Sequence, residues 1–277
     1  MNVDLHTHST ASDGTLSPHE LLAVAAASGV ELLALTDHDT LAGFDALRGT
    51  ASPLTLLPGV ELSVAWTRRD VHVVGLNFDP DNRQLRALLD AQQQARAERA
   101  ARIAAKLERR GAGNMLALAR EQAGGRTPGR VHFARGLVAT GVVKTTRDAF
   151  RRLLGDGKPA DVRGDWVKLD DAINALRRAG GEAILAHPLT YRLSATGLRA
   201  LLNEFAAAGG TAVEWADVRE HPNLARVLDE RITAHRLAVS SGSDFHGSTQ
   251  PWRRLGRIEP VPEHLPRIYE RWQVASG

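Results

Sequence analysis

Short apolar runs alternate with segments of helical periodicity along most of this chain. The runs that predict strands lie at residues 3–5, 32–36, 55–63, 71–76, 183–186, 211–214 and 237–240. Helical segments lie between them at 18–29, 170–179, 198–208 and 224–235. Ser17, Pro18 and Gly29 are suited to cap, open and end the first of these helices. The run 32–36 is typical of a parallel strand covered on both faces, so the pattern predicts an α/β fold.

The alternation stops between residues 80 and 159. This segment is rich in Ala, Arg and Gln, and it contains no apolar or β-branched run that would predict a strand. We therefore predict a helical insertion at 80–159, within a domain formed by residues 1–79 and 160–277.

Composition narrows the possible chemistry. The 277 residues are 43% hydrophobic and 24% charged, as in ordinary globular proteins, and there is no cysteine. Disulfides, thiolate metal sites and a cysteine nucleophile are thereby excluded. No apolar run is long enough to span a membrane, and no export signal is visible at the N-terminus. We expect a cytoplasmic protein without membrane contact and see no sign of an obligate protein partner.

The net charge of +3 is small, but its distribution is uneven. One predicted helix carries most of the local excess, with Arg96, Arg99, Arg102, Lys106, Arg109 and Arg110 against Glu98 and Glu108. Such a stretch is compatible with an anionic ligand or with a plain solvated helix face.

Histidines gather at the ends of the predicted strands. Seven of the eleven lie there or in short polar motifs: His6, His8, His38, His72, His132, His187 and His246. His6 and His8 are two apart, so in an extended strand both rings point to one face. Each of these residues alone could be a core or surface histidine.

Carboxylates accompany these histidines. Asp37 and Asp39 flank His38, Glu61 ends a strand, and Asp244 precedes His246 by two residues. Buried charges of this kind need an ion or a partner. Imidazole and carboxylate donors without thiolate favour Zn, Mn, Fe or a similar ion. The number of candidate ligands exceeds what one ion uses, so two or three ions are expected.

The order of these motifs resembles the polymerase-and-histidinol-phosphatase (PHP) family of metallophosphoesterases. The resemblance rests on His6-Thr7-His8-Ser9, Asp13-Gly14, Thr36-Asp37-His38-Asp39, Gly59-Val60-Glu61, His72, Arg130-Val131-His132-Phe133-Ala134-Arg135, Ala186-His187-Pro188 and Gly242-Ser243-Asp244-Phe245-His246. It covers nearly the whole chain. It is nearest the branch with an inserted helical domain, which includes nucleoside 3',5'-bisphosphate phosphatases and 5'-to-3' exoribonucleases. The resemblance implies a distorted (β/α)7 barrel of the PHP fold with a trinuclear metal centre.

The resemblance also implies a ligand set. A first ion would be held by His6, His8, Glu61 and Asp244. A second would be bridged by Glu61 and held also by His72 and His132, and a third by Asp13, His38 and His246. The expected cofactor is two or three divalent ions, most simply Mn²⁺, with Zn²⁺, Fe²⁺ and Mg²⁺ as alternatives.

Phosphate ester hydrolysis suits such a centre, since bound cations lower the pKa of water and absorb charge on phosphorus oxygens. Asp13 and His38 are candidate catalytic residues as well as ligands. His187 is a candidate acid, with a phosphate contact or a ligand as the other roles.

The arginines indicate the kind of substrate. Arg96 and Arg99 share a helix face, and Arg130 and Arg135 flank His132, so all four could bind a second phosphate. We therefore expect a nucleoside 3',5'-bisphosphate or a 5'-phosphorylated short RNA as substrate. The alternatives are a histidinol-phosphate-type phosphomonoesterase and a non-catalytic RNA- or protein-binding module.

Overall fold

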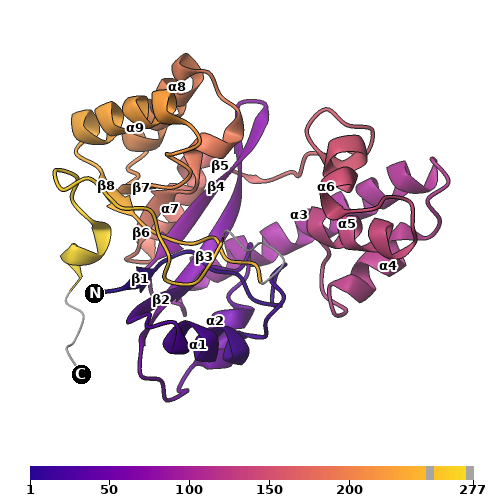
Figure 1. The fold of residues 1–277 in the computed structure, drawn as a ribbon, viewed down its shortest axis with the longest axis horizontal. Coiled ribbons are helices and arrows are strands. Elements are labelled where there is room, and N and C mark those ends of the chain that lie inside the picture. Colours follow the sequence, from indigo (N-terminus) through magenta and orange to yellow (C-terminus); the bar gives the residue numbers. More distant parts are fainter. Residues whose placement is uncertain (248–252, 273–277) are drawn as a thin grey trace.

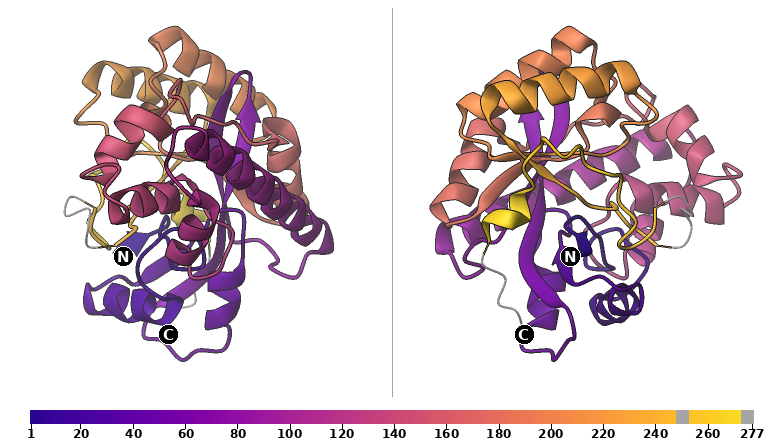
Figure 2. Two further views of the ribbon diagram at one scale, coloured as in Figure 1. Left: turned by 90° about the vertical axis from the view of Figure 1, so that its right-hand side faces the viewer. Right: turned by 60° about the vertical axis from the view of Figure 1, so that its left-hand side comes forward.

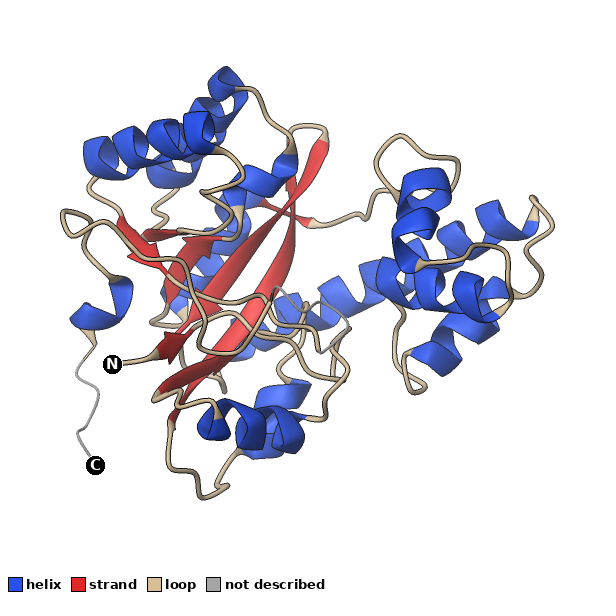
Figure 3. Ribbon diagram, in the orientation of Figure 1, coloured by secondary structure: helices blue, strands red, loops and turns tan. Residues whose placement is uncertain are grey.

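A curled sheet covered by helices forms one part of the molecule, and a group of helices beside it forms the other (Figure 1). The computed structural model describes residues 1–247 and 253–272. Figure 3 shows the separation by secondary structure, since all strands lie in the sheet-containing part. Among the described residues, none of the helices combines the length and apolar character that a membrane crossing requires.

The strands are arranged in the order β1-β2-β3-β4-β6-β7-β8, with β5 paired to β3. Their bounds are β1 Val3–Asp4, β2 Leu32–Leu35, β3 Thr55–Trp66, β4 Arg69–Leu76, β5 Val167–Lys168, β6 Glu182–Leu185, β7 Ala212–Glu214 and β8 Ala238–Ser240. Most neighbours are parallel, as predicted, but β4 is antiparallel to both β3 and β6. The tight turn between β3 and β4 forces this reversal, because a parallel pair needs a long crossover.

The two edges of the sheet meet at one seam. Thr7, just after β1, forms a parallel bridge with Phe245, beyond β8. The Leu5 N–H donates to the Ser241 carbonyl at 3.0 Å, and the Asp244 N–H donates to the His6 carbonyl at 2.9 Å. The sheet therefore closes into a distorted barrel, which confirms the predicted fold class.

Four helices of the barrel lie close to the predicted boundaries. They are α1 Pro18–Ala27, α7 Leu169–Arg178, α8 Ala195–Ala207 and α9 Pro222–His235, whereas the short helix α2 Ala42–Leu47 was not predicted. At the start of α1, Ser17 and Glu20 form a reciprocal capping box with Pro18 in the first turn. Gly29 follows in the left-handed region with φ of 76°, where a side chain would be strained. Figure 2 shows these helices wrapped around the sheet.

The inserted helices are α3 Arg83–Glu108, α4 Met115–Gln122, α5 Arg130–Ala139 and α6 Thr146–Ala149, followed by a π-helical turn at Phe150–Leu154. Their apolar core is separate from that of the barrel. The long helix α3 joins the two, because Leu85 and Leu89 lie in the barrel core whereas Ile103 and Leu107 lie in the insertion core. The change from one part to the other falls inside α3, and on the return path Val162 still packs in the insertion core.

Candidate metal centre

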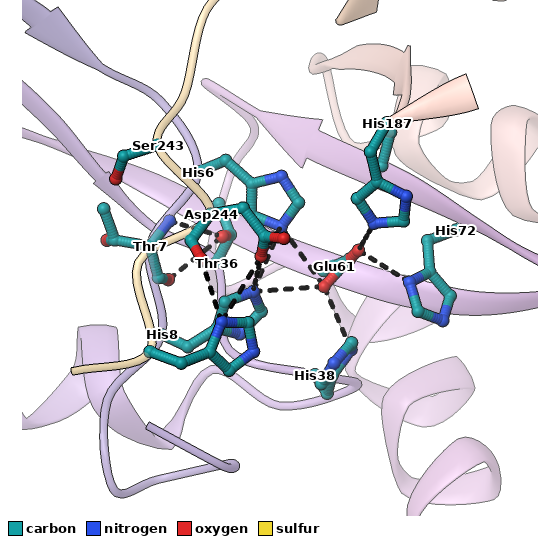
Figure 4. A network of polar contacts seen from close by, with 12 residues as sticks. His6, Thr7, His8, Thr36, His38, Glu61, His72, His187, Ser243 and Asp244 are labelled. Atoms are coloured by element: carbon teal, nitrogen blue, oxygen red, sulfur yellow. Dashed lines mark hydrogen bonds and ion pairs between the residues drawn. The ribbon is translucent and has the colours of Figure 1, made fainter. Parts of the chain in front are cut away.

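The barrel seam brings the first pair of histidines together. His6 and His8 follow β1, and their rings turn to the same site, as the alternation predicts (Figure 4). Their Nε2 atoms are 3.0 Å apart. Asp244, held beside them by the seam, brings its Oδ1 to 3.6 Å from His6 Nε2 and 3.4 Å from His8 Nε2. Residues separated by more than 230 positions thus share one site.

Glu61 on β3 lies at the centre of the imidazoles, as Figure 4 shows. Its carboxylate is fully buried. The five ring nitrogens near it are His6 Nε2 at 3.2 Å, His8 Nε2 at 3.2 Å, His38 Nδ1 at 3.1 Å, His72 Nδ1 at 2.8 Å and His187 Nε2 at 3.0 Å. Two of these rings come from segments that pair with β3: an isolated bridge joins His38 to Glu61, and β4 carries His72.

Asp13 forms a further centre on the other side of His38. Its Oδ1 lies 3.2 Å from His246 Nε2 and 3.9 Å from His8 Nδ1, and its Oδ2 lies 3.9 Å from His38 Nε2. Around it the rings of His8 and His246 stack with centroids 4.1 Å apart. His8 and His38 therefore connect this centre to that of Glu61.

Glu214 is a functional residue that the sequence analysis missed. It ends β7, is buried, and its Oε1 lies 2.6 Å from His6 Nδ1. Its Oε2 accepts the backbone N–H of His187 at 2.7 Å. A proton on His6 Nδ1 directs the lone pair of Nε2 toward His8 and Glu61, the usual orientation of a metal-ligating imidazole. Its place at the end of a strand was the signal that could have found it.

The donor set fits divalent cations. Three overlapping groups of ligand atoms each lie within 4.8 Å of one another, namely His8–Asp13–His38–His246, His6–His8–Glu61 and His38–Glu61–His72. Within the described residues, Asp13 Oδ1, His38 Nδ1 and His72 Nδ1 are buried and make no hydrogen bond. Buried polar atoms without a hydrogen bond are costly, and a shared cation would satisfy them. The absence of thiolate favours ions that accept imidazole and carboxylate.

Neighbouring opposite charges hold Glu61 and His246 in their ionised forms. Burial would raise the pKa of Glu61, but the imidazoles of His38, His72 and His6 outweigh it and hold that pKa well below its usual range. Burial would likewise lower the pKa of His246, but Asp13 and Asp244 raise it to about 10. Protons therefore occupy part of the site when no cation does, and metal binding must release them.

The backbone is strained at three positions around this site. Asp39, His187 and Asp244 have φ values of 53°, 27° and 52°, in the region that side chains rarely adopt. His187 precedes Pro188, which further restricts its conformation. Such strain persists where the surrounding structure enforces it, and here it coincides with residues of the polar cluster and their immediate neighbours.

His132, a predicted ligand, lies outside the three ligand groups of the described residues. It belongs to α5 of the insertion, and its Nδ1 accepts the backbone N–H of Gly129 at 3.0 Å. Burial lowers the pKa of His132 to about 4, so the ring is neutral near pH 7. A neutral ring whose Nδ1 accepts carries its proton on Nε2, where it can act as a hydrogen-bond donor.

The predicted phosphate-binding arginines on α3 are engaged in the protein. The Arg96 guanidinium pairs with Asp39 and donates to Ser63 Oγ at 2.9 Å. Arg99 donates to the Val162 carbonyl at 2.7 Å. Both guanidinium groups lie over the ring of Trp166, at 5.4 and 5.3 Å. These contacts attach α3 to the barrel, although both arginines still reach the site cavity.

Arg130 and Arg135 occupy different positions around His132. Arg135 donates to the Asp13 carbonyl at 2.8 Å, which ties α5 to the loop after β1. Among the described residues, Arg130 has only a long contact, 3.5 Å, with the exposed Asp156. Of the four predicted arginines, Arg130 is therefore the one with the least committed guanidinium group.

Two adjoining hollows open onto the cluster. The first, the Glu61 hollow, has a volume of about 220 Å³ and is lined by Glu61, His72, His187, Arg99, Arg130 and Phe150, among others. The second, the His132 hollow, has a volume of about 340 Å³ and is lined by His132, Ser12, Thr40, Gln93, Arg126 and Thr127, among others. Both are lined by Asp13, His38, Arg96 and Gly129. The barrel and the insertion thus form the walls together.

Comparisons with known proteins match this architecture along its length. The PHP domain family matches residues 4–127. A 5'-3' exoribonuclease of Haemophilus influenzae is 41% identical over 271 residues, which cover 97% of this chain and 98% of that protein. A 3',5'-nucleoside bisphosphate phosphatase of Chromobacterium violaceum is 40% identical over 264 residues, covering 94% and 93%. A solved structure of an amidohydrolase from Chromobacterium violaceum, with bound sulfate and no metal, has a TM-score of 0.89 at 38% identity and covers 98% of this chain and 95% of that one.

Proposed function

Since this chain belongs to the PHP family, we propose that it is a metal-dependent phosphoric ester hydrolase acting on nucleotides. Its reactions are removal of the 3'-phosphate from nucleoside 3',5'-bisphosphates and 5'-to-3' trimming of 5'-phosphorylated short RNA. The relatives named for these two activities support both. The proposal includes Mn²⁺ as the working cation and the cytoplasm as the compartment.

The convergence on Glu61 carries the proposal. One buried carboxylate has ring nitrogens of five histidines within 3.2 Å, and the Asp13 centre adjoins it through His8 and His38. Burying so many ionisable ligand-type groups around one point is costly unless a cation compensates them. The hollows beside them are lined with arginine, which suits a phosphate-bearing substrate.

Each donor group has a distinct part in holding cations. His6, His8, Glu61 and Asp244 would hold one ion, and Glu61 with His72 and His38 a second. Asp13 and His246, with His38 between the two centres, would hold a third. Cations bound there lower the pKa of water and neutralise charge on phosphate oxygens. Glu214 keeps the proton of His6 on Nδ1, so that His6 Nε2 stays available.

His187 also lies outside the three ligand groups of the described residues, but we propose that it joins Glu61 and His72 as a ligand of the second ion rather than acting as the acid. Its Nε2 approaches Glu61 at 3.0 Å, as closely as the ligand-type rings do, and its Nδ1 lies 3.2 Å from Thr190 Oγ1. His132 takes a different part. Its Nε2–H, at the wall of the His132 hollow, would donate to a phosphate oxygen of the substrate.

Arg130 is the residue that we propose for the second phosphate of the substrate. It lines the Glu61 hollow, and its guanidinium is nearly free. Arg130→Ala should raise the KM for a nucleoside 3',5'-bisphosphate about tenfold and the KM for the matching 3'-monophosphate by less than threefold, since one charged contact is lost. Arg147→Ala, at an exposed position of α6, is the control. Equal effects on both substrates would contradict this role.

A substrate panel tests the activity. Nucleoside 3',5'-bisphosphates, 2'- and 3'-monophosphates, histidinol phosphate and 5'-phosphorylated oligoribonucleotides are supplied with Mn²⁺, and release of phosphate or mononucleotide is followed. We expect kcat/KM to be highest for the bisphosphates and the oligonucleotides. Preference for histidinol phosphate, or no turnover of any compound by protein that holds metal, would refute the proposal.

A further inference from the structure

A third hollow continues the site cavity across the insertion. This Arg120 hollow has a volume of about 270 Å³ and is lined by Ala97, Ala100, Leu116, Arg120, Gly125, Arg126, Thr127 and Pro128. Arg126 and Thr127 also line the His132 hollow, which in turn borders the metal-ligand groups through Asp13 and His38. The three hollows therefore adjoin one another in a row from Glu61 to Arg120.

The wall between the His132 and Arg120 hollows is held by the turn from α4 to α5. The Gly125 N–H donates to the Arg120 carbonyl at 2.9 Å, and the Arg126 N–H donates to the Ala123 carbonyl at 3.2 Å. Gly124 and Gly125 have φ values of 60° and 84°, which allow the tight turn. This backbone places Arg126 between the two hollows and Arg120 at the far end of the row.

The chemistry of the Arg120 hollow suits a nucleotide unit. Ala97, Ala100, Leu116 and Pro128 supply apolar surface for a base or sugar, and Thr127 supplies a hydroxyl. Arg120 and Arg126 are exposed, and neither guanidinium has a hydrogen bond or ion pair with any described residue. No carboxylate of the described part of the chain lines the hollow. Free guanidinium groups beside apolar surface are what a phosphodiester chain requires.

A second basic groove on the insertion differs in that carboxylates line it and pair with part of its charge. This Lys106 groove, of about 520 Å³, is lined by Arg102, Lys106, Arg109, Arg163, Asp161 and Asp165, among others. Arg102 pairs with Asp165 at 2.9 Å, and Lys106 donates to the Asp161 carbonyl. The groove has no lining residue in common with the Glu61, His132 or Arg120 hollows. Its charge is partly neutralised, and it does not lead to the metal centre.

We propose that the path from the His132 hollow to the Arg120 hollow binds the part of an RNA chain that lies beyond the scissile phosphate. This inference rests on the proposed function and specifies its substrate: an oligoribonucleotide of more than one nucleotide engages the protein outside the catalytic pocket. The His132 and Arg120 hollows are near the lower end of the ~300–1,000 Å³ range of small-ligand pockets, so each accepts about one nucleotide. Arg126 and Arg120 contact successive phosphates.

Binding without turnover tests the path directly. Fluorescence anisotropy of a labelled, 5'-phosphorylated hexaribonucleotide is measured in EDTA with full-length wild type, Arg120→Glu and Arg109→Glu. Arg109 lines the Lys106 groove and is the matched control. We expect Arg120→Glu to raise Kd about tenfold and to reduce the slope of log Kd against log salt by about 0.7, the value for one phosphate contact with a single strand. Arg109→Glu should change Kd by less than twofold.

The outcomes separate this inference from the proposed function. Unchanged affinity in Arg120→Glu, or a larger loss in Arg109→Glu, overturns the path whatever the wild type hydrolyses. If instead Arg120→Glu weakens binding as expected, but the wild type with Mn²⁺ hydrolyses neither the hexaribonucleotide nor a nucleoside 3',5'-bisphosphate, the path stands and the proposed function fails. With an active wild type, the ratio of KM for the hexaribonucleotide to KM for a 3',5'-bisphosphate should rise about tenfold in Arg120→Glu, and a constant ratio overturns the inference.

Discussion

Two buried polar clusters lie side by side in this protein, and they differ in how far their members satisfy one another. Around Glu61 and Asp13, buried nitrogen and oxygen atoms point at a common space and several make no hydrogen bond. Around Asp39, the carboxylate accepts from the Ser63 N–H at 2.7 Å, from Gln92 at 3.0 Å and from Arg96. The first cluster is incomplete without a cation, whereas the second is complete and joins α3 to the barrel.

The difference separates function from architecture within a single motif. Asp37, His38 and Asp39 are consecutive, yet only His38 faces the metal centre. Asp37 accepts from the backbone and side chain of Ser9 and from Ser12, at 2.6–2.8 Å. Charge in a motif is therefore weak evidence of catalysis until the partners of each side chain are known.

The largest effect is expected at the centre of the unsatisfied cluster. Glu61→Gln keeps the size of the side chain but removes the charge shared by the surrounding imidazoles. We expect kcat/KM for a 3',5'-bisphosphate to fall at least about 1,000-fold, or ~4 kcal/mol, together with the bound metal. Phosphate release and metal content are measured beside Glu108→Gln, an exposed control on α3. Retention of a tenth of the activity would show that Glu61 is not a ligand.

The satisfied cluster should respond in stability instead. Asp39→Asn leaves the buried Arg96 without its counter-ion, and asparagine tolerates the left-handed backbone of this position. We expect the free energy of unfolding to fall by about 3–5 kcal/mol in urea, with metal content unchanged. The control is Asp90→Asn, at an exposed position of α3, the helix that carries Arg96. A loss of metal with unchanged stability would reverse the roles of the two clusters.

Adding metal should distinguish the clusters in one titration. A cation that binds only the folded state raises the free energy of unfolding by about 2.7 kcal/mol when its free concentration is 100 times its Kd. This increase corresponds to several degrees in Tm. After chelation, Mn²⁺ should restore this increase in the wild type and in Asp39→Asn, but not in Glu61→Gln. Calorimetry measures Tm. An equal increase in all three proteins would mean that the cation binds elsewhere.

The smallest effect concerns His132, which lines the His132 hollow together with Asp13 and Arg96. Because burial holds its pKa at about 4, folding favours the neutral ring, and the stability this contributes is lost as the pH falls from 6.5 toward 4. The free energy of unfolding of the metal-free protein should therefore fall by about 2 kcal/mol less in His132→Gln than in the wild type between pH 7.5 and pH 5. Urea unfolding at both pH values provides the comparison. The same acid dependence in both proteins would indicate that His132 protonates freely in the fold.

Much of the fold was predictable because its signals are local. The capped helix after Ser17, the apolar strands and the strand-free insertion all follow from short-range periodicity and turn residues. The reversal of β4 and the short strand β5 were not predicted. Pairing direction depends on which strands meet, and β5 is only two residues long.

The sequence by itself determined the ligand types and their order, because alternation in a strand and the order of the motifs are properties of the chain. The prediction that Glu61 ends its strand was wrong, since β3 continues to Trp66 and Glu61 lies in its interior. Only the tertiary structure decided which of these side chains share one space. Closure of the barrel at Thr7 and Phe245 brings Asp244 to His6, and α3 commits Arg96 to Asp39. The tertiary structure also places His132, on α5, in a wall of the cavity and apart from the ligand groups of the described residues. Such partnerships depend on long-range packing, which no local pattern encodes.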